Sequence, residues 1–246
     1  MTVVSPSGPP ALTLVVLAYN EEANVAPFLE TCLSWLDGLP NPADHEVLCI
    51  DDGSTDATAA RAAAVEAREA RVRLVRHETN QGMGAGMRSG FRNARGDYVT
   101  ILAADGQVPP QALDAMLPSL ARVPIVLTVY DRPPGEAYRV VLSQGLRVMM
   151  RALLGVSFRL EGIYLFPTHI ARDEVGLDRI GSSTFFFSFE LISRALALGY
   201  RAETLSITPQ RRMEGQSKVA NLSRIRRVAK ELVKFRWRLT RERLGR

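Results

Sequence analysis

The sequence predicts an α/β protein with a mostly parallel, Rossmann-like central sheet flanked by helices. Five short apolar runs have the length and β-branched content of strands. They span Leu12–Ala18, Glu46–Asp51, Val72–Arg76, Tyr98–Leu102 and Pro124–Val129. Helical stretches alternate with them, the clearest being Glu22–Trp35, Ala57–Glu69 and Gln111–Leu120. Such alternation favours right-handed crossovers, and ligands of these sheets bind beyond the carboxyl ends of the strands.

The composition is that of one globular domain of the larger kind. The chain has 246 residues, of which 46% are hydrophobic and 23% are charged, which suffices for one well-packed core. The two cysteines, Cys32 and Cys49, lie in apolar patterns, which predicts inert core thiols in a reducing compartment. No stretch reaches the roughly 18 apolar residues of a membrane span, and residues 1–11 lack the pattern of a signal peptide. We therefore expect a cytoplasmic protein with a flexible leader at residues 1–11.

The first two predicted strands each end in polar residues. After the second strand comes the run DDGSTD, in which Ser54 or Thr55 is expected to cap the next helix. Asp56 suits the positive end of that helix. Asp52 is then left to accept a hydrogen bond from a ribose hydroxyl or a base edge. Tyr19, which comes after the first strand, is expected to lie against the base.

A glycine-rich segment, Asn80–Gly86, leads into a helix that is expected to end near Ala94. Its three alternate glycines permit close backbone approach, which suits either a bound phosphate or only a tight turn. The spacing matches neither the dinucleotide fingerprint nor the phosphate loop that ends in Gly-Lys-Ser/Thr.

The fourth predicted strand delivers one carboxylate and one amide, Asp105 and Gln107, to the rim of the sheet. Oxygen ligands two residues apart can hold a hard divalent cation, Mg²⁺ or Mn²⁺, and such a cation neutralises a diphosphate. Asp and Gly after a strand are also ordinary turn residues. The pair is therefore a candidate metal and nucleotide-diphosphate site or a simple turn.

Other chemically capable residues carry weaker signals. His45, His77 and His169 are isolated, share no metal-ligand spacing and are expected in loops or on the surface. The phenylalanine-rich run 185–189 is expected to start a buried helix or to border a lipid-acceptor groove. Glu190 comes next, either as a buried acid with a role or as a carboxylate on the rim.

The tail, residues 219–246, carries most of the basicity of the chain. Ten Lys or Arg face two acids there, whereas the whole chain has a net charge of only +5. Apolar residues at helical spacing among these bases predict a basic amphipathic helix. Three uses compete: an anionic membrane surface, docking onto the body of the protein, and nucleic acid. We favour the membrane and expect no nucleic acid, because no nucleic-acid motif accompanies the charge.

Six motifs succeed one another along residues 12–218. They are Tyr19–Glu21, Cys49–Asp56, Asn80–Gly90, Arg95–Tyr98, Asp105–Gln107 with Pro109-Pro110, and Arg212–Lys218. In this order they resemble glycosyltransferase family 2, and most closely its dolichol- and polyprenyl-phosphate sugar synthases. The resemblance implies a GT-A fold over residues 12–218, with the basic helix after it at 219–246.

The resemblance also implies roles for individual residues. The residues implied to bind the nucleotide sugar are Leu17, Tyr19, Glu21, Ile50, Asp52, Ala103, Ala104, Asp105, Arg212 and Lys218. Of these, Asp105, Arg212 and Lys218 are the implied catalytic residues, the last two closing over the diphosphate. Asp105 and Gln107 are the implied metal ligands, and Arg139 and Ser143 the implied contacts to an acceptor phosphate.

The implied reaction moves a sugar from a nucleotide-diphosphate donor to a polyprenyl phosphate at the cytoplasmic membrane face. An acceptor phosphate is already ionised near neutral pH, so no strong general base is needed, and attack opposite the leaving group inverts the anomeric carbon. A divalent ion with Arg212 and Lys218 stabilises the departing diphosphate, and positioning supplies much of the acceleration.

Three positions depart from the family pattern. Ala103-Ala104-Asp105 replaces the usual Asp-Ala-Asp, Val129 stands where relatives carry an arginine, and Leu17 replaces a proline. These departures keep two alternatives open: a family 2 enzyme with a soluble acceptor, and a non-catalytic relative that only binds the sugar nucleotide. The base, the sugar, the acceptor and the oligomeric state cannot be read from the sequence.

Overall fold

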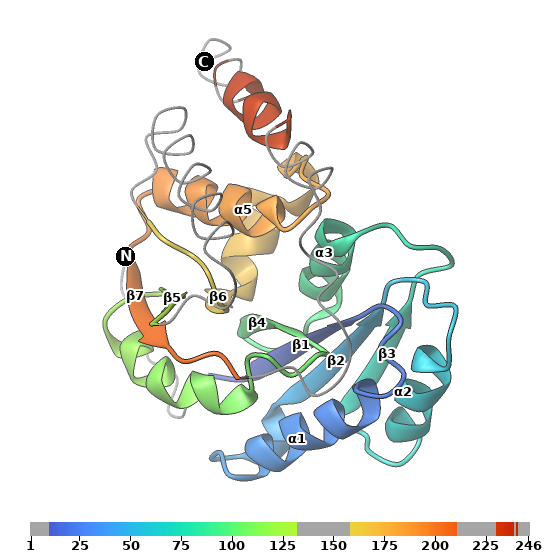
Figure 1. Ribbon diagram of the computed structural model, residues 1–246. Coiled ribbons are helices and arrows are strands. Elements are labelled where there is room, and N and C mark those ends of the chain that lie inside the picture. Colours follow the sequence, from blue (N-terminus) through green and yellow to red (C-terminus); the bar gives the residue numbers. More distant parts are fainter. Residues whose placement is uncertain (1–9, 132–157, 211–229, 239, 241–246) are drawn as a thin grey trace.

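The computed structural model describes residues 10–131, 158–210, 230–238 and 240. Within them, seven strands form a sheet in the order β3-β2-β1-β4-β6-β5-β7 (Figure 1). The strands are β1 Leu12–Ala18, β2 Glu46–Asp51, β3 Val72–Arg76, β4 Tyr98–Ala103, β5 Ile125–Tyr130, β6 Tyr164–Pro167 and β7 Ala202–Ile207. The first three have the predicted bounds, β4 extends one residue further at its end, and β5 is shifted by one residue at both ends.

The sheet is mostly parallel, as predicted. Strand β1 pairs in parallel with β2 and β4, β2 with β3, and β5 with β7. The short strand β6 lies between β4 and β5 and runs antiparallel to both. The carboxyl ends of β1, β2, β3 and β4 therefore meet at one edge, where open α/β sheets bind their ligands.

Two helical layers cover the sheet (Figure 1). Helices α1 (Val25–Asp37) and α2 (Thr58–Glu66) lie on one face, and α3 (Met83–Asn93) and α5 (Phe186–Ala197) lie on the other. Short helical turns are η1 Pro42–Asp44, η4 Ile170–Val175 and η5 Leu177–Arg179. Successive side chains of β1 point to opposite faces of the sheet, so the strand contributes to both cores. Leu14 and Val16 pack in the core under α1, whereas Val15 packs in the core under α3.

The segment predicted as one helix, Gln111–Leu120, is instead two short 3₁₀ helices, η2 Pro110–Ala115 and η3 Leu117–Ala121. Pro118 explains the break, because it has no backbone N–H to donate to the Asp114 carbonyl and its ring would clash with that carbonyl in a continuous α-helix. The helix predicted after Asn80–Gly86 is α3, and the one predicted near the phenylalanine run is α5.

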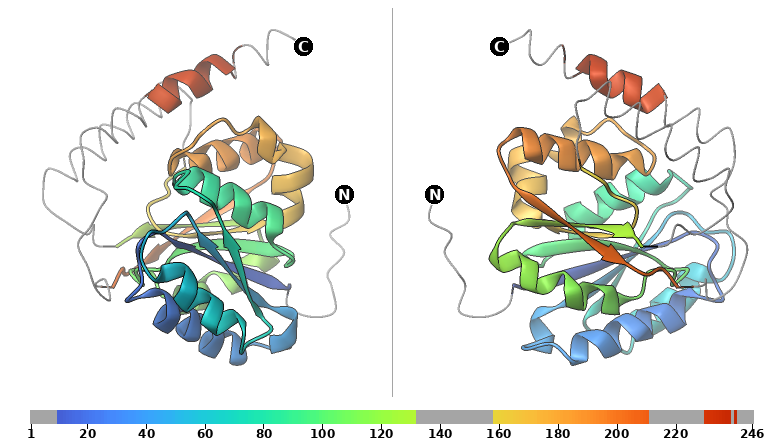
Figure 2. Two further views of the ribbon diagram at one scale, coloured as in Figure 1. Left: turned by 90° about the vertical axis from the view of Figure 1, so that its right-hand side faces the viewer. Right: turned by 60° about the vertical axis from the view of Figure 1, so that its left-hand side comes forward.

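Residues 230–238 form a helix that packs outside α5 (Figure 2). Leu232 and Phe235 are completely buried there, and the Phe235 ring meets that of Phe186 edge-on at a centroid distance of 6.0 Å. Of the three uses expected for the tail, docking onto the body is seen for this part. Among the residues that the structure describes, no helix has both the length and the apolar character needed to cross a bilayer.

Both cysteines are buried free thiols, as predicted. Burial raises the pKa of Cys32, and burial together with the charges of Asp51 and Glu66 raises the pKa of Cys49 to about 12. The thiolate is the reactive form, so burial makes both thiols poor nucleophiles in the folded protein.

The aromatic cluster under α3 yields a stability prediction. Phe91 is completely buried, with the rings of Tyr164, Phe166 and Phe187 at centroid distances of 6.5, 6.0 and 6.2 Å. We expect Phe91→Ala to lower the free energy of unfolding, measured with urea, by about 3–5 kcal/mol, because the cavity cannot close fully. Leu198→Ala, at a half-exposed position, should change it by no more than about 0.5 kcal/mol. Equal effects would contradict this packing.

Candidate functional site

The candidate site lies at the carboxyl ends of β2, β1 and β4, three neighbouring strands. The register sets Leu17 of β1 between Ile50 of β2 and Ala103 of β4. The row continues into the next turn, where the Ala104 N–H donates to the Leu17 carbonyl at 3.0 Å. The sheet thus brings together four residues that the sequence predicted for nucleotide-sugar binding.

The turns after β1 and β2 are bonded to each other. The Asn20 N–H donates to Ser54 Oγ at 2.9 Å, and the Thr55 N–H donates to Asn20 Oδ1 at 2.9 Å. Asn20 is left-handed, with a φ of 51°, which asparagine tolerates better than most residues. Tyr19 is 38% exposed beside this turn, so its ring is accessible to a flat ligand.

The predicted cap of α2 is corrected by this arrangement. Ser54 accepts from the β1 turn and Thr55 donates to it, so neither caps the helix. Ala57 occupies the N-cap position without a side-chain cap, and Asp56 just before it accepts at Oδ1 from the N–H of Thr58, the first residue of α2, at 2.9 Å. Burial raises the pKa of Asp56, but hydrogen bonds from Thr58 and Glu22 outweigh it and leave the pKa below the usual value. The Thr58 hydroxyl oxygen in turn accepts from the Glu21 N–H at 2.8 Å.

Asp52 is the most heavily bonded residue of the site. Its Oδ1 pairs with His77 Nδ1 at 2.7 Å and accepts from the Gln81 N–H at 3.0 Å. Its Oδ2 accepts from Asn80 Nδ2 at 3.0 Å and from the Gly82 N–H at 2.8 Å. The carboxylate that was expected to meet a ribose or base therefore holds the loop that leads into α3.

His77 lies in the loop directly after β3, one of the two places expected for it, but it is buried and not on the surface. Its second ring nitrogen, Nε2, lies 2.8 Å from Ser89 Oγ on α3. His45 is buried as well, and its Nδ1 accepts from the Leu12 N–H. The sequence carries a signal for this contact. His77 directly follows β3 and Asp52 directly follows β2, and the ends of two neighbouring parallel strands lie side by side.

Asp105 and Gln107 lie in one tight turn after β4. The Gln107 N–H donates to Asp105 Oδ1 at 3.1 Å, and the Asp105 side chain is almost buried. Burial and then the charges of Asp105 and Glu161 raise the pKa of Tyr130 to about 12, so its phenol stays protonated at neutral pH. Glu161 is held beside the end of β5, where its Oε2 accepts from the Tyr130 N–H at 3.3 Å.

Four predicted site residues, Arg139, Ser143, Arg212 and Lys218, lie outside the described residues. Val129, where the family pattern has an arginine, is buried in β5. In the part of the chain that the structure describes, no three His, Cys, Asp or Glu residues form a metal cluster. Asp105 and Gln107 are oxygen donors, and Mg²⁺ commonly completes the ligands of one or two such side chains with phosphate oxygens and water.

A cavity of about 250 Å³ lies at the opposite edge of the sheet, beside the start of β4 and the end of β6. Its wall includes Asp97, Thr168 and Arg172. Two of these side chains form structural hydrogen bonds: Asp97 accepts from the Ala11 N–H, and Arg172 donates to the carbonyl of Phe91 near the end of α3. Because the cavity lies at the edge opposite the carboxyl ends of β1, β2 and β4, it is separate from the candidate site.

The chain is similar in sequence to known glycosyltransferases. The sequence profile described as "Glycosyl transferase family 2" matches residues 13–188. The dolichol-phosphate mannosyltransferase of Mycosarcoma maydis is 25% identical, over 67% of this chain and 59% of its own. The dodecaprenyl-phosphate galacturonate synthase of Rhizobium johnstonii is 34% identical, over 59% of this chain and 44% of its own.

A solved structure supports the fold. It is the glucosyl-3-phosphoglycerate synthase of Mycobacterium tuberculosis in complex with Mn²⁺, UDP and glucosyl-3-phosphoglycerate. It superposes with a TM-score of 0.66 at 20% identity, covering 92% of this chain and 80% of that one. The chain spans only 59% and 44% of the lengths of the two curated relatives named above.

The bonding of Asp52 can be tested directly. We expect Asp52→Ala to lower the free energy of unfolding by about 3 kcal/mol, because several partly buried donors lose their acceptor at roughly 1–3 kcal/mol each without full additivity. Amide exchange in residues 80–82 should become faster. Asp173→Ala, which removes an exposed carboxylate, is the control. Unchanged exchange at residues 80–82 in Asp52→Ala would contradict the assigned hydrogen bonds.

Proposed function

Because the chain belongs to glycosyl transferase family 2, we propose that it is an inverting hexosyltransferase that moves a sugar from a nucleotide diphosphate to a polyprenyl phosphate. The observation that carries this proposal is the row of Ile50, Leu17 and Ala103 with Asp105 shortly after it, at one edge of the sheet. The lipid acceptor is supported by the names of the two curated relatives, both of which specify a polyprenyl-type phosphate.

Each part of the donor has a suitable place at this edge. The exposed ring of Tyr19 can stack on a base, while Leu17, which is only partly buried, offers an apolar contact. Ile50 is completely buried on the neighbouring strand and would support Leu17 from there. Asp105 and Gln107 would hold a divalent cation, which supplies the charge that neutralises the diphosphate when bound. That assignment fits the oxygen-donor chemistry of the pair and its place at the end of β4.

The remaining roles fall on four residues outside the described part of the chain. Arg212 and Lys218 would close over the diphosphate and stabilise its negative charge as it departs. Arg139 and Ser143 would hold the acceptor phosphate, whose oxygen attacks the anomeric carbon without a strong base. The chain would thus act mainly by positioning two anions and by compensating their charge.

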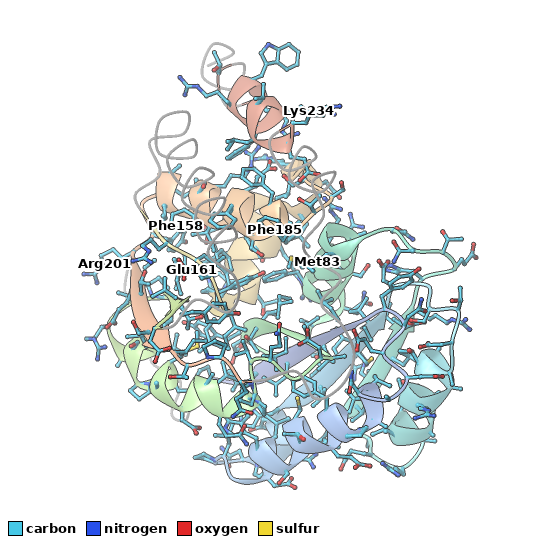
Figure 3. The ribbon with its side chains drawn as sticks, in the orientation of Figure 1. Met83, Phe158, Glu161, Phe185, Arg201 and Lys234 are labelled. Atoms are coloured by element: carbon cyan, nitrogen blue, oxygen red, sulfur yellow. The ribbon has the colours of Figure 1, made fainter. Side chains whose placement is uncertain are left out.

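The C-terminal helix supports a membrane location. Its inner face packs on α5, whereas Lys230, Val233, Lys234 and Trp237 are exposed, and Figure 3 marks Lys234 on this helix. A tryptophan beside lysines is typical of helices that lie on anionic bilayers. We therefore propose peripheral attachment at the cytoplasmic membrane face through this outer face, which brings the enzyme to a lipid-linked acceptor.

A soluble acceptor is the second candidate function. It is favoured by the fold likeness to the glucosyl-3-phosphoglycerate synthase, whose structure contains a phosphoglycerate product in place of a lipid. A non-catalytic, sugar-nucleotide-binding protein is the third, motivated by Ala103 and Val129 in place of charged residues. Both retain the donor edge. The second candidate differs from the main proposal in its acceptor, and the third differs because no sugar is transferred.

Donor binding is tested by calorimetric titration with GDP, UDP, CDP and dTDP, each with and without Mn²⁺. We expect one nucleotide to bind tightly and only with the metal. Asp105→Ala should weaken that binding at least about tenfold, which corresponds to roughly 1.4 kcal/mol, whereas Asp173→Ala should leave it unchanged. Metal-independent binding would argue against Asp105 and Gln107 as ligands, and no binding of any nucleotide would refute the donor site.

Membrane attachment is tested with vesicles that contain anionic lipid. Lys230→Ala with Lys234→Ala should weaken binding by about 1 kcal/mol for each charge removed, and added salt should weaken it further. Arg95→Ala with Arg201→Ala removes two exposed bases from other elements and is the matched control. Equal losses in the two double variants, or no vesicle binding by the unaltered protein, would count against the proposed membrane face.

A further inference from the structure

The C-terminal helix, residues 230–238, reaches the body through a nearly buried acid as well as through apolar packing. Glu231 Oε1 accepts from the Ser183 N–H at 2.9 Å and from Ser183 Oγ at 2.8 Å. Its Oε2 accepts from Thr184 Oγ1 at 2.6 Å. Only 9% of Glu231 is exposed, so these donors replace most of its hydration. The three bonds fix the turn that precedes α5.

That turn lies directly against the start of α3. The Gly84 N–H donates to the Ser183 carbonyl at 3.0 Å. A Cβ atom added to Gly84 would lie 2.5 Å from the Ser183 carbonyl carbon, a distance that real side chains do not reach. Figure 3 labels Met83 and Phe185, which flank this contact on its two segments. The first turn of α3 therefore cannot be placed independently of the Ser183 turn.

The same first turn of α3 lies against the proposed donor edge. The Gly82 N–H donates to Asp52 Oδ2 at 2.8 Å. A Cβ on Gly86 would lie 3.2 Å from Leu17 Cδ2 and 3.8 Å from Ile50 Cγ2, so the helix backbone packs on these two side chains. Leu17 is partly exposed and is assigned to the donor, Ile50 lies completely buried beside it, and Asp52 holds the loop before α3. A shift of α3 would therefore change the shape of the surface that receives the nucleotide.

We infer that Glu231 is a positioning residue for donor binding, which it controls through the Ser183 turn and the glycine-rich start of α3. The inference rests on the proposed function for its donor, but its structural part does not. Arg238 reinforces the connection, because its Nη2 donates to the fully buried Glu190 at 2.7 Å, and Glu190 accepts from Ser182 Oγ at 2.6 Å. Two acids on different helices thus hold successive residues of one turn.

The test compares Glu231→Ala and Glu231→Gln with Arg236→Ala in the full chain. Arg236 is exposed on the same helix, so its loss should change nothing that depends on the Ser183 turn. Two readouts are used: amide exchange over residues 80–86 and 181–187, and the Kd of the nucleotide diphosphate that the unaltered protein binds with Mn²⁺. Thermal unfolding shows whether each variant is folded, and Ser183→Ala replaces Glu231→Ala if that variant is not.

We expect faster exchange over residues 80–86 in Glu231→Ala and an increase in the nucleotide Kd of about fivefold, the lower end for coupled sites. Glu231→Gln should lie between that variant and the unaltered protein, because an amide keeps one accepting oxygen. Faster exchange confined to residues 181–187, with an unchanged Kd, would give Glu231 a purely local role and overturn the inference. If the unaltered protein binds no nucleotide, the proposed function fails, while exchange over residues 80–86 still decides the coupling.

Discussion

The arrangement of the candidate site depends on the hydrogen bonds that the Asp52 carboxylate accepts. This carboxylate lies at the end of a buried strand, where a charge without partners would be costly. Four donors from residues 77–82 satisfy it, and together they fix the loop before α3. With that loop fixed, Gly86 of α3 packs against Leu17 of β1, and Gly84 packs against Ser183. The second contact helps to position the turn before α5.

A second buried carboxylate, Glu190, has a similar effect on the outer layer. It is completely buried in α5 and is compensated by Arg194 and Arg238. Removing one partner of such a group is expensive, although the whole pair need not add to stability. Because Arg238 comes from the C-terminal helix, the charge of Glu190 favours one docked position of that helix. The apolar contact of Phe235 with Phe186 adds the packing energy.

The C-terminal helix has two faces with different surroundings. One face carries Glu231 and Arg238 toward the body, while the other carries Lys234 and Trp237 toward the solvent. The helix at residues 230–238 can therefore dock on the body through one face while its other face is available to an anionic surface.

The sequence by itself determined the strands β1 to β3 and the polar edge that they form, because apolar runs bounded by turn residues report local structure directly. It also placed Leu17, Ile50 and Asp105 correctly after or within their strands, and its ordered motifs identified the family. Only the tertiary structure decided that Asp52 is bonded to His77 and that Glu231 holds Ser183. Those pairs are separated by 25 and 48 positions, and hydrogen bonds between such distant residues leave no periodic trace in a sequence.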